Sequence, residues 1–209
     1  MGYYTDLFLR PKQAVAYAYA HPSLVRSIGF VILGTLLGAV GSFLLVGEIT
    51  PSVVIAGLSG DLARWLLGGI ILLLIGLAFK GLSFSGENVS RVLTLLAQLN
   101  LYGFFVFLIM GIIFPVLVIP EILVASGQAN SGVIGPEEFQ QVVYATLAQP
   151  NVTILAAFLF LISFVFVLYS IYVLFLSIQK YLDTTVFKSI LVMILLLGVQ
   201  SFFTFILLG

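Results

Sequence analysis

The sequence predicts an all-α polytopic membrane protein with five transmembrane helices, a short N-terminal interfacial helix and an outer surface helix. Apolar residues make up 62% of the 209-residue chain and charged residues only 8%, whereas soluble domains contain about 45–50% and about 25%. The charged residues fall between long apolar runs, and roughly 20 apolar residues are what a helix needs to cross a bilayer. These runs are continuous rather than alternating, which favours helices over a membrane β-barrel.

Charge balance and cysteine content exclude several classes of function. The eight basic and eight acidic residues cancel, so the chain lacks the basic surface that nucleic acid requires. Cysteine is absent, which excludes disulfides, thiolate catalysis and cysteine-based metal sites. A single histidine, His21, cannot form a zinc site of the usual Cys/His type alone. We therefore expect no enzyme activity, no metal or other cofactor and no nucleic-acid partner.

The N-terminal segment, residues 1–26, is expected to lie on the cytoplasmic side of the membrane. Pro11 suits the first position of a helix, and Tyr17 and Tyr19 suit the depth of the lipid headgroups. Residues 11–20 are therefore predicted to form a short interfacial helix. A cleaved signal peptide is not expected, because the apolar run that follows has the length of a full span.

A transmembrane domain of five helices is expected over residues 27–209. The spans are placed on the five long runs that lack charged residues. Asp61 suits the N-cap of the second span, and Pro115 marks the place where the long third span should bend. The spans are predicted near residues 27–46, 63–79, 92–119, 152–178 and 187–208.

The basic residues predict the orientation of these spans. Seven of the eight fall on one side of the membrane in this arrangement, and the positive-inside rule makes that side cytoplasmic. Arg64 falls on the other side, where the loop 120–151 carries three glutamates and no basic residue. We therefore expect a multi-pass protein of the cell membrane, with its N-terminus in the cytoplasm and its C-terminus outside. The seven cytoplasmic basic residues are Arg10, Lys12, Arg26, Lys80, Arg91, Lys180 and Lys188.

Two outer segments are expected to be more structured than linkers. Pro136 followed by Glu137 and Glu138 is typical of a helix start, and a surface helix is predicted from about 136 to 148. The segment 51–58 is mildly apolar, and its pattern fits either a short surface helix or a re-entrant dip. The apolar residues at helical spacing in the first of these segments form a candidate docking face: Phe139, Val142 and Val143.

Polar and small residues within the spans are candidates for contacts between helices. No span carries a charged residue or histidine at depth, as an ion or proton path normally would. Uncharged amides in lipid usually hydrogen-bond across helices, and the candidate intramembrane polar contacts are Gln98, Asn100 and Gln200. Gly34 and Gly38 are candidate helix-packing residues, within this chain or against another.

Several stretches resemble the Yip domain family, the Ypt/Rab-interacting five-span membrane proteins, and in particular its prokaryotic branch. Residues 9–14 with His21-Pro22 resemble the lead-in of prokaryotic members, 168–188 resemble the fourth span and its polar loop, and 92–107 are similar to the third span. The resemblance implies an architecture more than a mechanism. Eukaryotic members carry a long cytosolic N-terminal region, whereas about 26 residues precede the first span here, so binding of small GTPases is not expected.

Two kinds of function remain open. The leading expectation is a non-enzymatic, Yip-like protein that acts by helix-mediated association, as a membrane-organising protein or an accessory subunit of a larger membrane complex. Its partners would be the lipid bilayer and other membrane proteins or copies of itself. The alternative is a small transporter, channel or lipid-moving protein with a polar intramembrane site formed by the three amides. A solvated cavity that contains those amides would favour the alternative.

Overall fold

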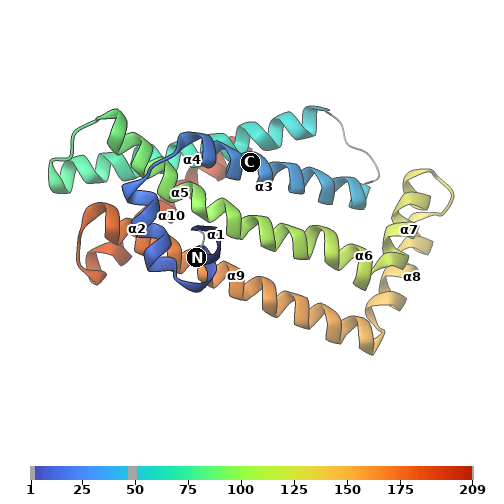
Figure 1. The fold of residues 1–209 in the computed structure, drawn as a ribbon. Helices are drawn as coiled ribbons and strands as arrows, with labels where there is room; N and C mark the ends of the chain where they lie inside the picture. The colour runs from blue at the N-terminus through green and yellow to red at the C-terminus, as the bar shows by residue number, and fades with distance from the viewer. Residues whose placement is uncertain (1–2, 47–50, 209) are drawn as a thin grey trace. The chain divides into compact units, whose positions relative to one another are not determined.

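The computed structural model describes residues 3–46 and 51–208, and all regular secondary structure in this part is helical (Figure 1). The expected all-α class is therefore confirmed. The helices in chain order are α1 (Tyr3–Leu9), α2 (Pro11–Ala20), α3 (Leu24–Val46), α4 (Pro51–Lys80), α5 (Gly86–Phe107), η1 (Leu108–Ile113), α6 (Phe114–Val118), α7 (Pro120–Asn130), α8 (Pro136–Leu147), α9 (Pro150–Leu182) and α10 (Val186–Leu208).

Three helical segments are long and apolar enough to cross a membrane, which makes this a multi-pass membrane protein. They are Val54–Lys80, Gly86–Val118 and Pro150–Leu182. Two further apolar helices are shorter over the residues described, Leu24–Leu37 and Val186–Phe202. Each of these five segments overlaps one of the five charge-free runs of the sequence and also includes one to three charged residues. The count of five spans and their orientation in the membrane stay predictions.

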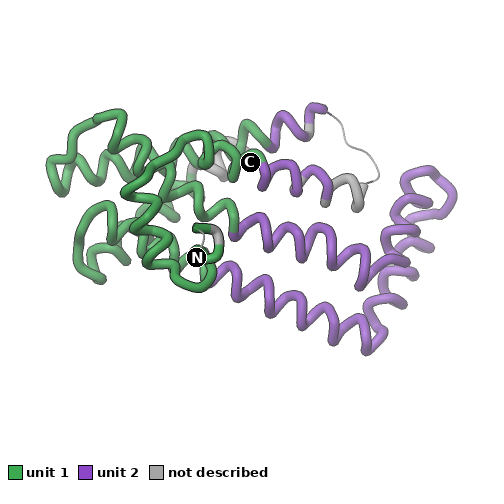
Figure 2. The backbone as a smooth tube through the Cα atoms, in the orientation of Figure 1, with its two compact units in different colours: residues 1–32, 58–101, 169–209 green, residues 33–57, 102–168 purple. Residues whose placement is uncertain are grey.

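The chain forms two compact units, shown in different colours in Figure 2. Unit 1 comprises residues 1–32, 58–101 and 169–209, and unit 2 comprises residues 33–57 and 102–168. All eight basic residues belong to unit 1, together with four acidic residues, whereas unit 2 contains four acidic residues and no basic one. The uneven distribution of basic residues along the sequence thus corresponds to a difference in charge between unit 1 and unit 2.

Five of the seven prolines stand at the first residue of a helix, namely in α2, α4, α7, α8 and α9. Proline suits this position because its missing N–H would have no partner there and its φ is already helical. The helices α2 and α8 begin at Pro11 and Pro136, as predicted for the interfacial helix and the outer surface helix. Local covalent geometry therefore sets where these helices start.

The helix that contains the predicted second span begins well before residue 63. Helix α4 runs without interruption from Pro51 to Lys80, so 51–58 is neither a separate surface helix nor a re-entrant dip. The N-cap expected at Asp61 is also wrong, because Asp61 lies within the helix and its carboxylate is 3.9 Å from the Arg64 guanidinium. Pro51 supplies the helix start, and nothing between it and residue 61 breaks the helix.

The third span departs from α-helical geometry close to the expected bend. A π-helical segment, Leu108–Ile113, lies between α5 and α6, immediately before Pro115. Proline cannot donate a backbone hydrogen bond and its ring crowds the carbonyl four residues earlier, and the wider π turn gives that ring room. Helix α6 ends at Val118, and the φ of −128° and ψ of 43° at Ile119 lie outside the helical region, before Pro120 starts α7.

Each unit has its own apolar core. In unit 1 the fully buried side chains include Leu72, Leu95 and Leu196, from three of the long helices. The Trp65 indole is also buried there and donates to the Leu93 carbonyl at 2.9 Å. The buried cluster of unit 2 consists of Ile109, Val118, Ile119, Val152 and Leu159.

Candidate functional site

Close helix packing in unit 1 occurs at glycines of α4. A Cβ placed on Gly68 would collide with the Gln200 amide, and one placed on Gly69 would collide with the Leu93 side chain. Small residues allow membrane helices this close approach. At Gly34, by contrast, a Cβ would meet nothing within 4 Å, so close packing there stays a prediction for another molecule. The surroundings of Gly38 lie outside the described residues.

The three candidate amides have different environments within unit 1. Gln200 donates from Nε2 to the Arg64 carbonyl at 3.3 Å and so joins α10 to α4. Asn100 is half-buried. Gln98 is fully buried, and neither atom of its amide has a hydrogen-bond partner among the described residues. The structure therefore gives one amide a hydrogen bond to another helix and leaves a second one buried without a partner among the described residues.

The predicted docking face lies on α8 in unit 2. Phe139, Val142 and Val143 are each half-buried, and α8 packs against α7. The Thr146 hydroxyl donates to the Glu121 carboxylate across this helix pair at 3.0 Å. Much of the expected docking face is therefore covered by the same unit.

The start of α8 explains its acidic residues. The Glu138 carboxylate accepts a hydrogen bond from the Gly135 backbone N–H at 3.1 Å. This satisfies a donor that a helix N-terminus otherwise leaves free, and the negative charge is favourable beside the positive end of the helix dipole. Glu138 thus has a local structural role, as its position in the first turn predicts.

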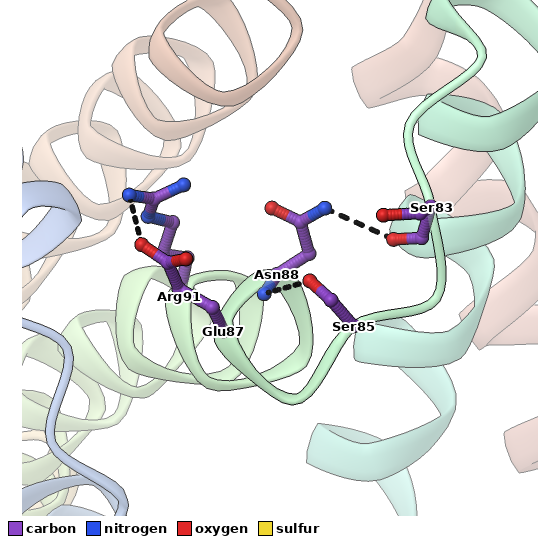
Figure 3. Close-up of polar contacts among 5 residues, drawn as sticks. All are labelled: Ser83, Ser85, Glu87, Asn88 and Arg91. Atoms are coloured by element: carbon purple, nitrogen blue, oxygen red, sulfur yellow. Dashed lines mark hydrogen bonds and ion pairs between the residues drawn. The ribbon is translucent and has the colours of Figure 1, made fainter.

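A second polar group of unit 1 was not singled out by the sequence, and it is centred on Tyr19. The Arg91 guanidinium lies 4.8 Å from the centre of the Tyr19 ring, and the Lys180 ammonium lies 5.4 Å from it. Arg91 also forms an ion pair with Glu87 (Figure 3). Helix α2 is thereby tied to α5 and α9 by one aromatic ring between two cations.

The same loop region in Figure 3 shows how α5 begins. The Ser85 hydroxyl accepts from the Asn88 backbone N–H at 3.2 Å, in the geometry of an N-cap. The Asn88 side chain donates to the Ser83 carbonyl at 2.9 Å. These bonds place Glu87, and hence its partner Arg91, on the first turns of the helix.

Arg26 forms a similar cation–aromatic group on the other side of α2. Its guanidinium lies 4.6 Å from the Tyr3 ring and 5.8 Å from the Tyr17 ring. His21 stacks on Tyr17 with ring centres 4.5 Å apart, so the one histidine of the chain has a packing role. Ser27 and Thr94 join α3 to α5 nearby through their hydroxyls at 3.3 Å.

Two neighbouring cavities at the end of α9 share Asp183 and Thr184 in their walls. The first has a volume of about 390 Å³ and is lined by Phe79, Lys80, Leu182, Asp183, Thr184, Thr185, Lys188, Leu191 and Val192. The second has a volume of about 610 Å³ and is lined by Lys12, Val15, Tyr19, Leu176, Gln179, Lys180, Asp183 and Thr184. We call this pair of cavities the lysine recess, because every lysine of the chain contributes to it.

Over the residues that the structure describes, no group of three His, Asp or Glu side chains could hold a metal ion. Asp183 is the one carboxylate in the described walls of the lysine recess. The arrangement suits recognition of a negatively charged group rather than binding of a cation.

Comparison of the chain with protein-family models, with curated proteins and with solved structures finds no match. No residue role can therefore be transferred from a relative. The resemblance to the Yip domain family stays a prediction from the sequence.

Proposed function

We propose that the protein is a non-enzymatic, five-span integral membrane protein of Yip-like architecture that acts by helix-mediated association. It would serve as a membrane-organising protein or as an accessory subunit of a larger membrane complex. Its partners would be other membrane proteins, or further copies of the chain, together with the surrounding lipid. One feature of unit 2 carries this proposal, an open apolar groove along α9.

The groove has a volume of about 780 Å³, and its walls are entirely apolar. It is lined by Met110, Phe114, Ala156, Ala157, Phe160, Leu161 and Phe164. The small Ala156-Ala157 pair leaves room for a neighbouring helix, and the aromatic residues offer large contact areas around it. Phe160 and Leu161 are 64% and 60% exposed, so an apolar helix could bury them. These features support association as the function.

Cross-linking in native membranes tests this proposal. The chain lacks cysteine, so Ala157→Cys creates a single reactive site in the groove. It should give a discrete cross-linked product with a membrane protein or with a second copy. Val165→Cys is the matched control, because Val165 is an exposed residue of the same helix that does not line the groove. Equal and diffuse labelling of both variants would contradict a specific association.

A variant that blocks the groove provides a second test of the same proposal. Ala157→Phe should fill the groove and release a partner that copurifies with the wild-type protein, whereas Val165→Phe should not. Because both variants place a phenylalanine on an exposed position of α9, their effects on folding should be similar. Retention of the partner by Ala157→Phe would show that association does not use the groove.

One observation favours the alternative function of a transporter, channel or lipid-moving protein. Gln98 is a buried amide without a partner among the described residues, and such a group normally bonds to protein, water or ligand. However, none of the three amides lines the groove or the lysine recess. Flux of small polar solutes into vesicles that contain the purified protein, lost on Gln98→Leu, would support this alternative.

A further inference from the structure

The lysine recess brings together residues that are far apart in the sequence. Lys12 comes from α2, Lys80 from the end of α4, Lys180 from the end of α9, and Lys188 from the start of α10. The chain has four lysines in all. The four lysines come from four different helices, so their positions in the sequence do not bring them together. They meet at two cavities that share the Asp183–Thr184 turn because of the way unit 1 folds.

The recess carries an excess of positive charge. Asp183 is the single carboxylate among the described residues of its walls, and it pairs with Lys80 at 3.3 Å. Lys12, Lys180 and Lys188 therefore face the recess without a carboxylate partner in its walls. The Lys180 ammonium lies over the Tyr19 ring, which Arg91 also approaches. A negatively charged group would complement this surface.

The two cavities differ in a way that matches an amphipathic ligand. Beside its lysines, the first cavity has apolar walls from Phe79, Leu182, Leu191 and Val192. The second adds a polar donor, the Gln179 amide, and the Thr184 hydroxyl lies in the walls of both. A soluble phosphate would leave the apolar walls uncovered, whereas an acyl chain would cover them. The shape and chemistry therefore favour a lipid over a free anion.

The position of the recess also fits a lipid headgroup. It lies where α4 ends at Lys80 and α9 ends at Leu182, and both helices belong to segments that are apolar enough to cross the membrane. The ends of spanning helices lie at the depth of the headgroups. Basic residues at this depth attract anionic lipids, by about fivefold in affinity for each lysine.

We infer that the lysine recess binds the phosphate-bearing headgroup of an anionic phospholipid, with an acyl chain along its apolar walls. The inference rests on the membrane location of the chain and not on the association partner proposed above. Lys12, Lys180 and Lys188 contact the headgroup, and Lys80 joins them when its pair with Asp183 opens. Asp183 thus competes with the ligand for one lysine.

The backbone of Asp183 supports this role. Its φ of 43° is the one positive φ outside glycine among the described residues, and its side chain is 94% exposed. Left-handed backbone costs an aspartate less than most residues, and asparagine adopts it equally well. Asp183→Asn should therefore keep the turn while it removes the competing charge.

Lipid binding by the purified full-length protein in neutral detergent tests the inference. Native mass spectrometry should show tighter binding of phosphatidylglycerol than of phosphatidylcholine with the same acyl chains. The double variant Lys12→Gln/Lys188→Gln should weaken phosphatidylglycerol binding by about 25-fold, from about fivefold for each lysine. The matched control, Arg10→Gln/Arg64→Gln, removes the same charge outside the recess and should change this binding by less than about threefold.

Asp183→Asn distinguishes loss of the site from loss of folding, because it should strengthen phosphatidylglycerol binding by about fivefold. Equal affinity for the two lipids, equal loss in the lysine and arginine variants, or weaker binding by Asp183→Asn would overturn the inference. Full displacement of phosphatidylglycerol by millimolar inorganic phosphate would also overturn it, in favour of a free phosphate ligand. Loss of the association partner in Ala157→Phe leaves these outcomes unaffected, so the two proposals fail separately.

Discussion

The Gln200 amide occupies the space opposite Gly68, where it donates to the Arg64 carbonyl at 3.3 Å. A side chain on Gly68 and the amide of Gln200 cannot both keep these positions. The contact therefore links a small residue of α4 to Gln200 of α10, which the sequence predicts to make a polar contact between helices. A substitution at Gly68 should therefore change the stability of the protein by an amount that depends on the residue at position 200.

Relative to Gly198→Ala, Gly68→Ala should lower the free energy of unfolding by about 1 kcal/mol, because the new methyl group displaces the Gln200 amide and breaks its hydrogen bond. In a Gln200→Ala background the same change should cost much less, since the obstructing amide is gone. Thermal unfolding of the four proteins in detergent, arranged as a double-mutant cycle, measures the coupling. Gly198→Ala serves as control, because a Cβ at Gly198 meets nothing within 4 Å. Additive effects would show that the close approach is absent.

Gln98→Leu should raise the free energy of unfolding by about 1 kcal/mol. The substitution replaces a buried amide that has no partner among the described residues with an apolar side chain of similar volume. Chemical unfolding in detergent measures the change, and Gln98→Asn is the control that keeps the amide and shortens the side chain. A clear loss of stability in Gln98→Leu would mean that the amide has a partner outside the described residues.

Single cysteines at Ser83 and Asn130 should be labelled from opposite sides of sealed membrane vesicles. This result is expected because seven of the eight basic residues predict one side as cytoplasmic. Ser83 is preferable to Ser85, whose hydroxyl caps α5. Labelling of residues 83 and 130 by the same impermeant reagent from one side would contradict the predicted orientation.

Glu138→Ala should lower the free energy of unfolding by about 0.3–1 kcal/mol, because it removes both an acceptor and a favourable charge at a helix start. Glu137→Ala, in the same turn, should cost less, since Glu138 holds the Gly135 N–H. Thermal unfolding of both variants measures the difference. Glu138→Gln should leave any function intact, and a loss of function with unchanged folding would reveal a chemical role for this carboxylate.

Much of the architecture follows from local signals in the sequence. The charge-free runs predict the apolar helices, and proline followed by acidic residues predicts α8 correctly. Helix α7 begins with Pro120 and Glu121 in the same way, so this signal could have found it. Helix α1 could not be found, because its seven residues are too few for a periodic pattern.

The candidate sites were harder to predict than the helices. The sequence places the lysines on one side of the membrane, but it does not say that 12, 80, 180 and 188 meet at one turn. That meeting depends on how the ends of separate helices pack, and periodicity within each helix carries no such information. The groove of unit 2 was missed for the same reason, since it joins Met110 and Phe114 to residues of α9.

The prolines at the starts of five helices have a consequence for the behaviour of the chain in different lipids. The proline ring restricts the backbone conformations of the unfolded chain at those positions. This restriction does not depend on the lipid that surrounds the folded protein. The contacts between helices, by contrast, depend on the thickness of the bilayer and on the lipid acyl chains around the protein. A thinner or thicker bilayer should therefore change the tilt of the helices and the contacts between them, while each of these five helices still begins at the same proline.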